Sequence, residues 1–124
     1  MNEPRDTAPA ETSDGLRVVS SWEADRLILV LHGDLDIDTL AVAQDAVTAA
    51  ERQAPPVLVL DLSRLGYVDS SGVRLVLLAR QVADDADRRL AVRLGHGSPR
   101  RVFDMLGITE RLEVLDDDGE ASPR

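Results

Sequence analysis

The stretch that decides the fold runs from Val57 to Val73 and has the sequence VLVLDLSRLGYVDSSGV. Its first five residues, 57–61, form a nearly continuous apolar run, which is typical of a strand buried on both faces of a sheet. From Ser71 onward the apolar residues recur with a helical period that extends to about Ala83. Ser70 and Ser71 therefore lie where a loop leaves a strand and enters a helix. The free N–H groups of a helix's first turn favour a negative charge such as a phosphate at that place.

The segments on either side of this stretch alternate between strand and helix patterns. The patterns predict strands at 16–21, 26–31, 57–61, 90–94 and 112–115, and helices at 39–52, 71–83 and 98–105. A hairpin followed by right-handed β-α-β crossovers gives an α/β fold. We expect a small, mixed, mostly parallel sheet of four to five strands with helices packed on it.

Composition divides the chain into one domain and two tails. Residues 1–15 are rich in Pro, Ala, Thr, Asp and Glu and are predicted to be a disordered tail, and 116–124 a flexible acidic tail. The remaining segment, 16–115, is expected to form a single domain. Only three aromatic residues are present, Trp22, Tyr67 and Phe103, so the core must consist mainly of aliphatic side chains.

The charge balance and the missing cysteines exclude several classes of protein. The formal net charge is −9, whereas nucleic-acid binders present a basic surface, so no nucleic-acid partner is expected. The chain has no cysteine, and therefore no disulfide and no thiolate metal site. No apolar stretch approaches the length of a membrane span. We expect a cytoplasmic, monomeric protein without a membrane partner or cofactor.

The Asp69–Gly72 segment allows two interpretations. It is either a simple helix cap, with Asp or Ser at the N-cap position and Gly easing the turn, or a regulated hydroxyl. Phosphorylation would add about −1.5 to −2 charges and three acceptor oxygens. The helix N-terminus would tolerate that charge, but a protein–protein interface formed around a neutral serine would not.

Three motifs together resemble the STAS domain of bacterial anti-sigma factor antagonists. They are L-H-G-D-L-D at 31–36, V-D-S-S-G-V at 68–73 and S-P-R-R-V-F-D-M-L-G-I at 98–108, and the resemblance covers 16–115. It implies a STAS-like fold and a partner-switching function. In that family the unmodified antagonist binds a serine-kinase anti-sigma factor and frees a sigma factor, and so regulates transcription, for example in stress responses.

The resemblance also implies how the switch works and which residues take part. The kinase would phosphorylate the second serine of the motif, Ser71, and a PP2C-type serine phosphatase would reverse the modification. Asp36 and Asp69 would belong to the partner surface. The alternative is a STAS scaffold or transporter-associated regulatory module that is not phosphorylated.

We expect the partner surface to surround the phosphorylation site. On a helical wheel, Val73 and Leu77 fall on the polar side of their helix and would form an exposed apolar centre with a polar rim. The full set of expected partner-binding residues is Asp34, Asp36, Asp69, Ser70, Gly72, Val73, Arg74 and Leu77.

Catalysis and metal binding are not expected. The nucleophile elbow G-x-S-x-G is absent around Ser71, and no catalytic residue is assigned. The D-x-D-x-D spacing at 34–38 resembles the start of a calcium loop, but Thr39 and Asp45 occupy the positions that require Gly and Glu. His32 and His96 are isolated in the sequence, so neither suggests a zinc site.

Overall fold

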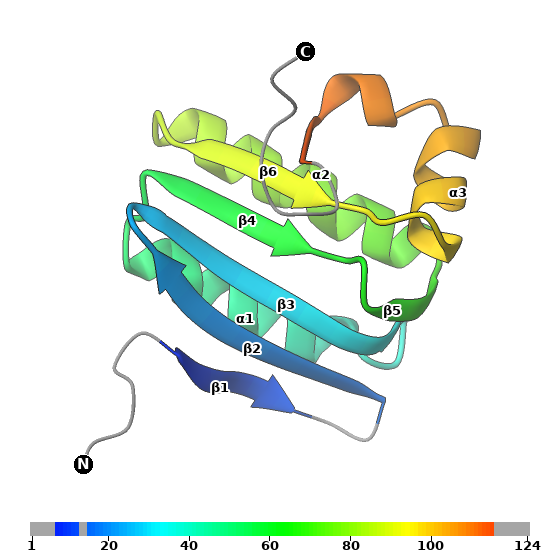
Figure 1. Ribbon diagram of the computed structural model, residues 1–124, viewed down its shortest axis with the longest axis horizontal. Helices are drawn as coiled ribbons and strands as arrows, with labels where there is room; N and C mark the ends of the chain where they lie inside the picture. The colour runs from blue at the N-terminus through cyan, green and yellow to red at the C-terminus, as the bar shows by residue number, and fades with distance from the viewer. Residues whose placement is uncertain (1–6, 13–14, 116–124) are drawn as a thin grey trace.

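Two parallel strands, β3 (Arg26–Leu35) and β4 (Val57–Asp61), form the centre of the sheet (Figure 1). The computed structural model describes residues 7–12 and 15–115. All five residues of β4 are buried, as its continuous apolar sequence predicted.

The sheet of the described residues has seven strands in the order β1-β2-β3-β4-β6-β7, with β5 pairing with β3 beyond the end of β4. The other strands are β1 (Thr7–Thr12), β2 (Leu16–Glu23), β5 (Leu65–Val68), β6 (Arg89–Arg93) and β7 (Glu113–Leu115). Strands β1, β2 and β3 are antiparallel neighbours, and all other pairs are parallel. The prediction of a mixed, mostly parallel α/β sheet is confirmed.

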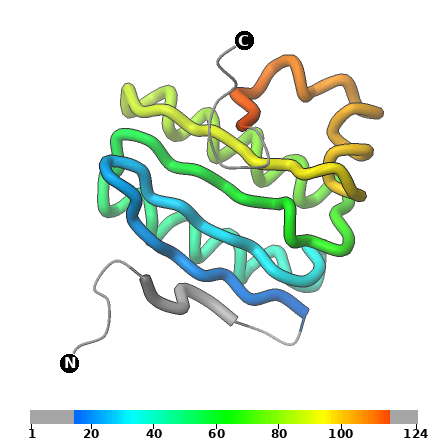
Figure 2. The backbone as a smooth tube through the Cα atoms, viewed as in Figure 1, coloured from blue at the N-terminus to red at the C-terminus, as the bar shows by residue number. Residues whose placement is uncertain are grey.

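Helices α1 (Leu40–Arg52) and α2 (Ser70–Asp85) lie side by side on one face of the sheet (Figures 1 and 2). Alternate strand residues such as Leu29, Leu60 and Val92 pack beneath these helices in the main core. Helix α3 (Ser98–Met105) packs at β5 and is followed by a 3-10 turn, η1 (Thr109–Arg111). The main core therefore lies between one face of the sheet and the helices.

Strand β1 is a correction to the predicted tail. Residues 7–12 pair with β2, from Thr7 opposite Ser21 to Thr12 opposite Arg17, with one irregularity in register. Backbone N–H and C=O groups at the edge of a sheet accept any extended segment, so the composition of 1–15 gave no sign of this strand. The predicted tail residues 1–6 and 13–14, and the predicted acidic tail 116–124, lie outside the described residues.

Strand β5 is the second addition to the four to five strands expected. It has four residues, one of them glycine, which is too short to show a period. A turn returns the chain to β3: the Asp61 carboxylate accepts hydrogen bonds from the Ser63 N–H at 3.0 Å and the Ser63 hydroxyl at 2.6 Å. Asp61 also forms a 2.8 Å ion pair with Arg93, its cross-strand neighbour on β6. This mostly buried cluster fixes where the chain leaves β4.

His32 gives the fold a dependence on pH. Its pKa lies below the ordinary value of 6.5 because of burial, and then because of Arg17 and Arg64, while Asp61 opposes the shift. Arg17 is directly opposite His32 in the β2–β3 register. The folded chain therefore prefers neutral imidazole, whereas the unfolded chain takes up a proton near pH 6.5.

We expect the free energy of unfolding to fall as the pH drops below the pKa of His32 in the unfolded chain. Above that pH, the contribution of neutral His32 to stability is complete. Urea unfolding at about pH 7.5 and about pH 5.5 measures this loss. His32→Gln should lose less stability than wild type between the two values, because it removes the proton uptake. Equal losses in the two proteins would contradict the assignment.

Candidate functional site

The register of β3 and β5 brings the two loops of the predicted site together. Leu35 pairs with Val68 in parallel, so the two strands end at the same edge of the sheet. The loop 36–39 leaves that edge and enters α1, and Asp69 leaves it and enters α2. The acidic segment and the serine motif, which are separated by about 30 residues in sequence, therefore lie beside each other.

Asp69 caps helix α2. Its backbone is extended, with φ −116° and ψ −170°, and its carboxylate accepts the Ser71 N–H at 2.9 Å. Its backbone carbonyl accepts the N–H groups of Gly72 at 3.0 Å and Val73 at 3.2 Å. The helix therefore begins at Ser70, and the capping interpretation of the motif is confirmed with Asp69 as the capping residue.

The cap leaves both serine hydroxyls unused. Ser70 is exposed, Ser71 is half-buried, and neither hydroxyl forms a hydrogen bond with another described residue. Because the Asp69 carboxylate accepts the Ser71 N–H, the Ser71 hydroxyl is not needed to cap the helix. A modification of that hydroxyl would therefore remove no capping hydrogen bond. The capping and regulatory interpretations are therefore compatible.

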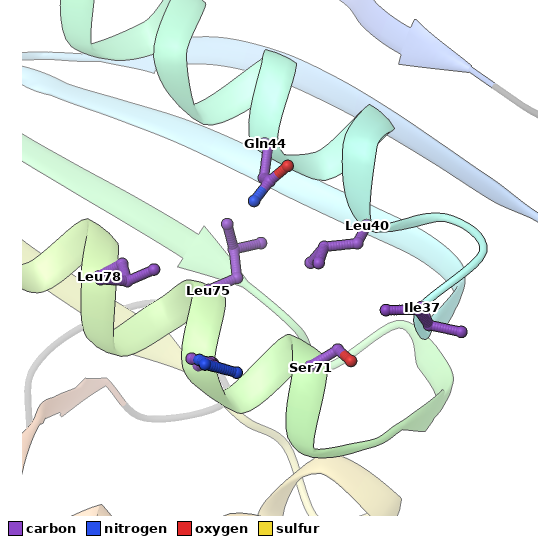
Figure 3. Close-up of a pocket in the computed structure, with 7 residues that line it drawn as sticks. Ile37, Leu40, Gln44, Ser71, Leu75 and Leu78 are labelled. Atoms are coloured by element: carbon purple, nitrogen blue, oxygen red, sulfur yellow. The ribbon is translucent and has the colours of Figure 1, made fainter.

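Ser71 lines a pocket of about 310 Å³ between α1 and α2. Figure 3 shows the Leu40 and Leu75 side chains in the gap between the helices, with Ser71 at the end nearer Ile37. The lining residues are Ile37, Leu40, Gln44, Ser71, Arg74, Leu75 and Leu78. Gln44, Ser71 and Arg74 are the polar residues of this lining, and the other four are apolar.

A second hollow of about 370 Å³ continues this pocket along the two helices and shares Gln44, Leu75 and Leu78 with it. It is lined further by Asp45, Val47, Thr48, Ala79 and Val82. We refer to the two hollows together as the α1–α2 groove. The exposed apolar side chains along it are Ile37 (69%), Leu78 (56%) and Val82 (48%).

The groove corrects the predicted apolar centre. Val73 is only 6% exposed and belongs to the main core, and Leu77 is half-buried against it. Leu77 also lines a hollow with Arg111, so this flank of α2 faces η1. The helical wheel assumed one buried face, whereas α2 is covered on two sides, and the exposed apolar side chains are Leu78 and Val82 instead.

Gly72 is a packing residue, which corrects its predicted place on the partner surface. It is buried, and a Cβ atom built there would lie 2.6 Å from Val68 Cγ2 and 2.8 Å from Leu35 Cδ2. Only a residue without a side chain allows the first turn of α2 to approach the two paired strand ends this closely.

We expect Gly72→Ala to lower the free energy of unfolding by about 1–3 kcal/mol, because the added methyl group must displace Leu35 and Val68. Urea denaturation measures the change. Ser70→Ala is the control, since it changes an exposed residue of the same helical turn. If Gly72→Ala were as stable as Ser70→Ala, close packing would not explain this glycine.

The acidic loop before α1 is held by Asp36. Its carboxylate accepts the N–H groups of Asp38 at 3.0 Å and Thr39 at 3.1 Å. The buried Thr39 hydroxyl donates to the Asp34 carbonyl at 2.8 Å and accepts the Asp36 N–H at 3.1 Å. These bonds satisfy backbone groups ahead of α1 and leave Ile37 projecting at the edge of the groove. Within residues 7–12 and 15–115, no group of three or more His, Asp or Glu residues could hold a metal ion.

We expect Asp36→Ala to destabilise the chain by about 1 kcal/mol, the usual net effect of losing a side-chain hydrogen bond, because the N–H groups of Asp38 and Thr39 lose their acceptor. Asp38→Ala removes a carboxylate of the same loop that is exposed and accepts no hydrogen bond from a described residue, so it should stay close to wild type. Thermal unfolding followed by circular dichroism compares the two variants. Equal melting temperatures would show that the Asp36 bonds do not stabilise the loop.

Sequence reasoning located Ser71, Asp36 and Asp69 in one place but missed the groove. Ile37 is an apolar residue between two aspartates, and on the helical wheel Leu78 and Val82 fall on the apolar side of the helix, which predicts burial for both. Their exposure depends on the distance between α1 and α2, which periodicity does not encode. Of the remaining predicted residues, Asp34 and Arg74 are exposed.

Comparison with known proteins agrees with this architecture. The family model described as "Mlab, STAS domain" matches residues 18–116. The chain therefore belongs to the STAS-domain family. No curated protein sequence matches the chain, and no helix in the part of the chain that the structure describes is long and apolar enough to span a bilayer.

Solved structures share the fold at low sequence identity. An anti-sigma factor antagonist from Mycobacterium paratuberculosis aligns with a TM-score of 0.76 and 18% identity, over 85% of this chain and 89% of its own. The unphosphorylated anti-sigma factor antagonist SpoIIAA aligns at 0.66 and 21%, over 83% and 90%. The phosphorylated Bacillus SpoIIAA aligns at 0.61 and 20%, over 83% and 93%.

Proposed function

We propose that this protein is an anti-sigma factor antagonist that binds a serine-kinase anti-sigma factor and is released from it by phosphorylation of Ser71. The observation that supports this most is the position of Ser71 on the α1–α2 groove, with Asp69 serving as the helix cap. The anti-sigma factor would cover the groove, and the sigma factor would be free as long as Ser71 is unmodified.

Phosphorylation would change the surface and leave the fold intact. The kinase transfers the γ-phosphoryl group of ATP: a bond forms between Ser71 Oγ and phosphorus, the bond to the ADP oxygen breaks, and the hydroxyl proton leaves. The first turn of α2 tolerates the new charge because the positive end of the helix dipole lies there. SpoIIAA, whose unphosphorylated and phosphorylated structures both share this fold, supports a modification that preserves the architecture.

The same charge opposes docking on an apolar surface. An anti-sigma factor that seats apolar side chains beside Ile37 and Leu78 would have to remove water from a dianion at Ser71. A combined desolvation and repulsion of about 3 kcal/mol weakens binding about a hundredfold. A PP2C-type serine phosphatase would restore the binding form in the cytoplasm.

The test of modification begins with an extract of the cells that make this protein. The wild-type chain is incubated in this extract, recovered together with the anti-sigma factor that it binds, and then supplied with ATP. The mass of the intact chain should increase by one phosphate. Ser71→Ala should gain none, whereas Ser70→Ala, the neighbouring exposed serine, should gain it as wild type does. Phosphate on Ser70→Ala and Ser71→Ala alike would refute Ser71 as the site.

The binding arm uses the purified anti-sigma factor. Ser71→Asp should bind about a hundredfold more weakly than wild type, with unchanged far-ultraviolet circular dichroism and melting temperature. Tight binding by Ser71→Asp would contradict the switch. If the retained partner is a transporter subunit or scaffold and no phosphate is gained, the chain is the unphosphorylated STAS module considered above.

A further inference from the structure

Arg74 and Ser71 face the same pocket from one helix. They are three residues apart on α2, so their side chains leave neighbouring positions on one face. Both line the pocket between α1 and α2. Arg74 is exposed and has no ion-pair partner among the described residues.

The other charges near Ser71 are carboxylates. Asp69 already binds the Ser71 N–H through its carboxylate. The loop before α1 adds Asp36 and Asp38, while α1 contributes the neutral Gln44 to this pocket. A phosphate on Ser71 would meet like charges on the loop side and one guanidinium on the pocket side.

We propose that Arg74 pairs with the phosphate of phosphorylated Ser71, and that the pair covers the end of the α1–α2 groove beside Ile37 and Leu40. This rests on the proposed function for the presence of the phosphate and adds how the modified site is arranged. A planar guanidinium suits two phosphate oxygens at once. Phosphorylation thereby closes part of the docking surface as well as charging it.

The pairing has a measurable consequence for the phosphate. A nearby guanidinium favours the dianion and lowers the second phosphate pKa, whereas the carboxylates of Asp36, Asp38 and Asp69 raise it. Removing the charge of residue 74 leaves only the carboxylates, so the second pKa should rise.

The experiment uses the full chain with phosphoserine installed at position 71 by genetic code expansion, and follows the phosphorus-31 shift against pH. We expect Arg74→Gln to raise the second phosphate pKa by about 0.5 or more, and Arg74→Lys to restore part of the decrease. Arg80→Gln is the matched control, because Arg80 lies on the same helix but faces Asp84 at 3.6 Å. Identical titrations of wild type and Arg74→Gln would overturn the pairing.

A second readout tests whether the pair covers the groove. Methyl resonances of Ile37 and Leu40 should shift on phosphorylation in wild type and shift less in Arg74→Gln. Unmoved methyl resonances in phosphorylated wild type would overturn the covering. Because the phosphate is installed directly, these outcomes do not depend on a kinase: failure of the kinase assay refutes the proposed function, and failure here refutes the role of Arg74.

Discussion

The close approach of α2 to the paired ends of β3 and β5 is the constraint on which the site depends. Leu35 and Val68 form the last register of the parallel pair, and Gly72 lets the helix rest directly against both. That contact sets where Ser71 emerges relative to the loop before α1. Without it, the hydroxyl and the acidic loop would have no fixed relation.

In this site, the side chains that cap the helices are different from the side chain that carries the hydroxyl. Asp69 and Asp36 supply the side-chain acceptors that begin α2 and shape the entry to α1. Ser71 and Ile37 are consequently left to face the groove. A phosphate can then be added to one side chain without removing a bond that the helix needs, which is what a reversible switch requires.

Sequence patterns predicted those elements of the fold that are determined by residues close together in the chain. The buried run of β4, the three helices and the convergence of Asp36 with Ser71 follow from period, caps and strand direction. The edge strand β1 and the two-sided burial of Val73 and Leu77 do not, because backbone pairing and neighbouring elements decide them. The family motifs indicated the hydroxyl, but only the packing of α1 on α2 reveals the groove beside it.

The most direct test of the account is the binding footprint of the purified anti-sigma factor on the isotope-labelled, unmodified chain. Amide shift changes and line broadening should cluster on Ile37, along the exposed side of α1 from Leu40 to Thr48, and on α2 from Ser70 to Val82. A footprint confined to the sheet face opposite the helices, around Val30 and Ala91, would contradict the claim that the surface at Ser71 is where the partner docks.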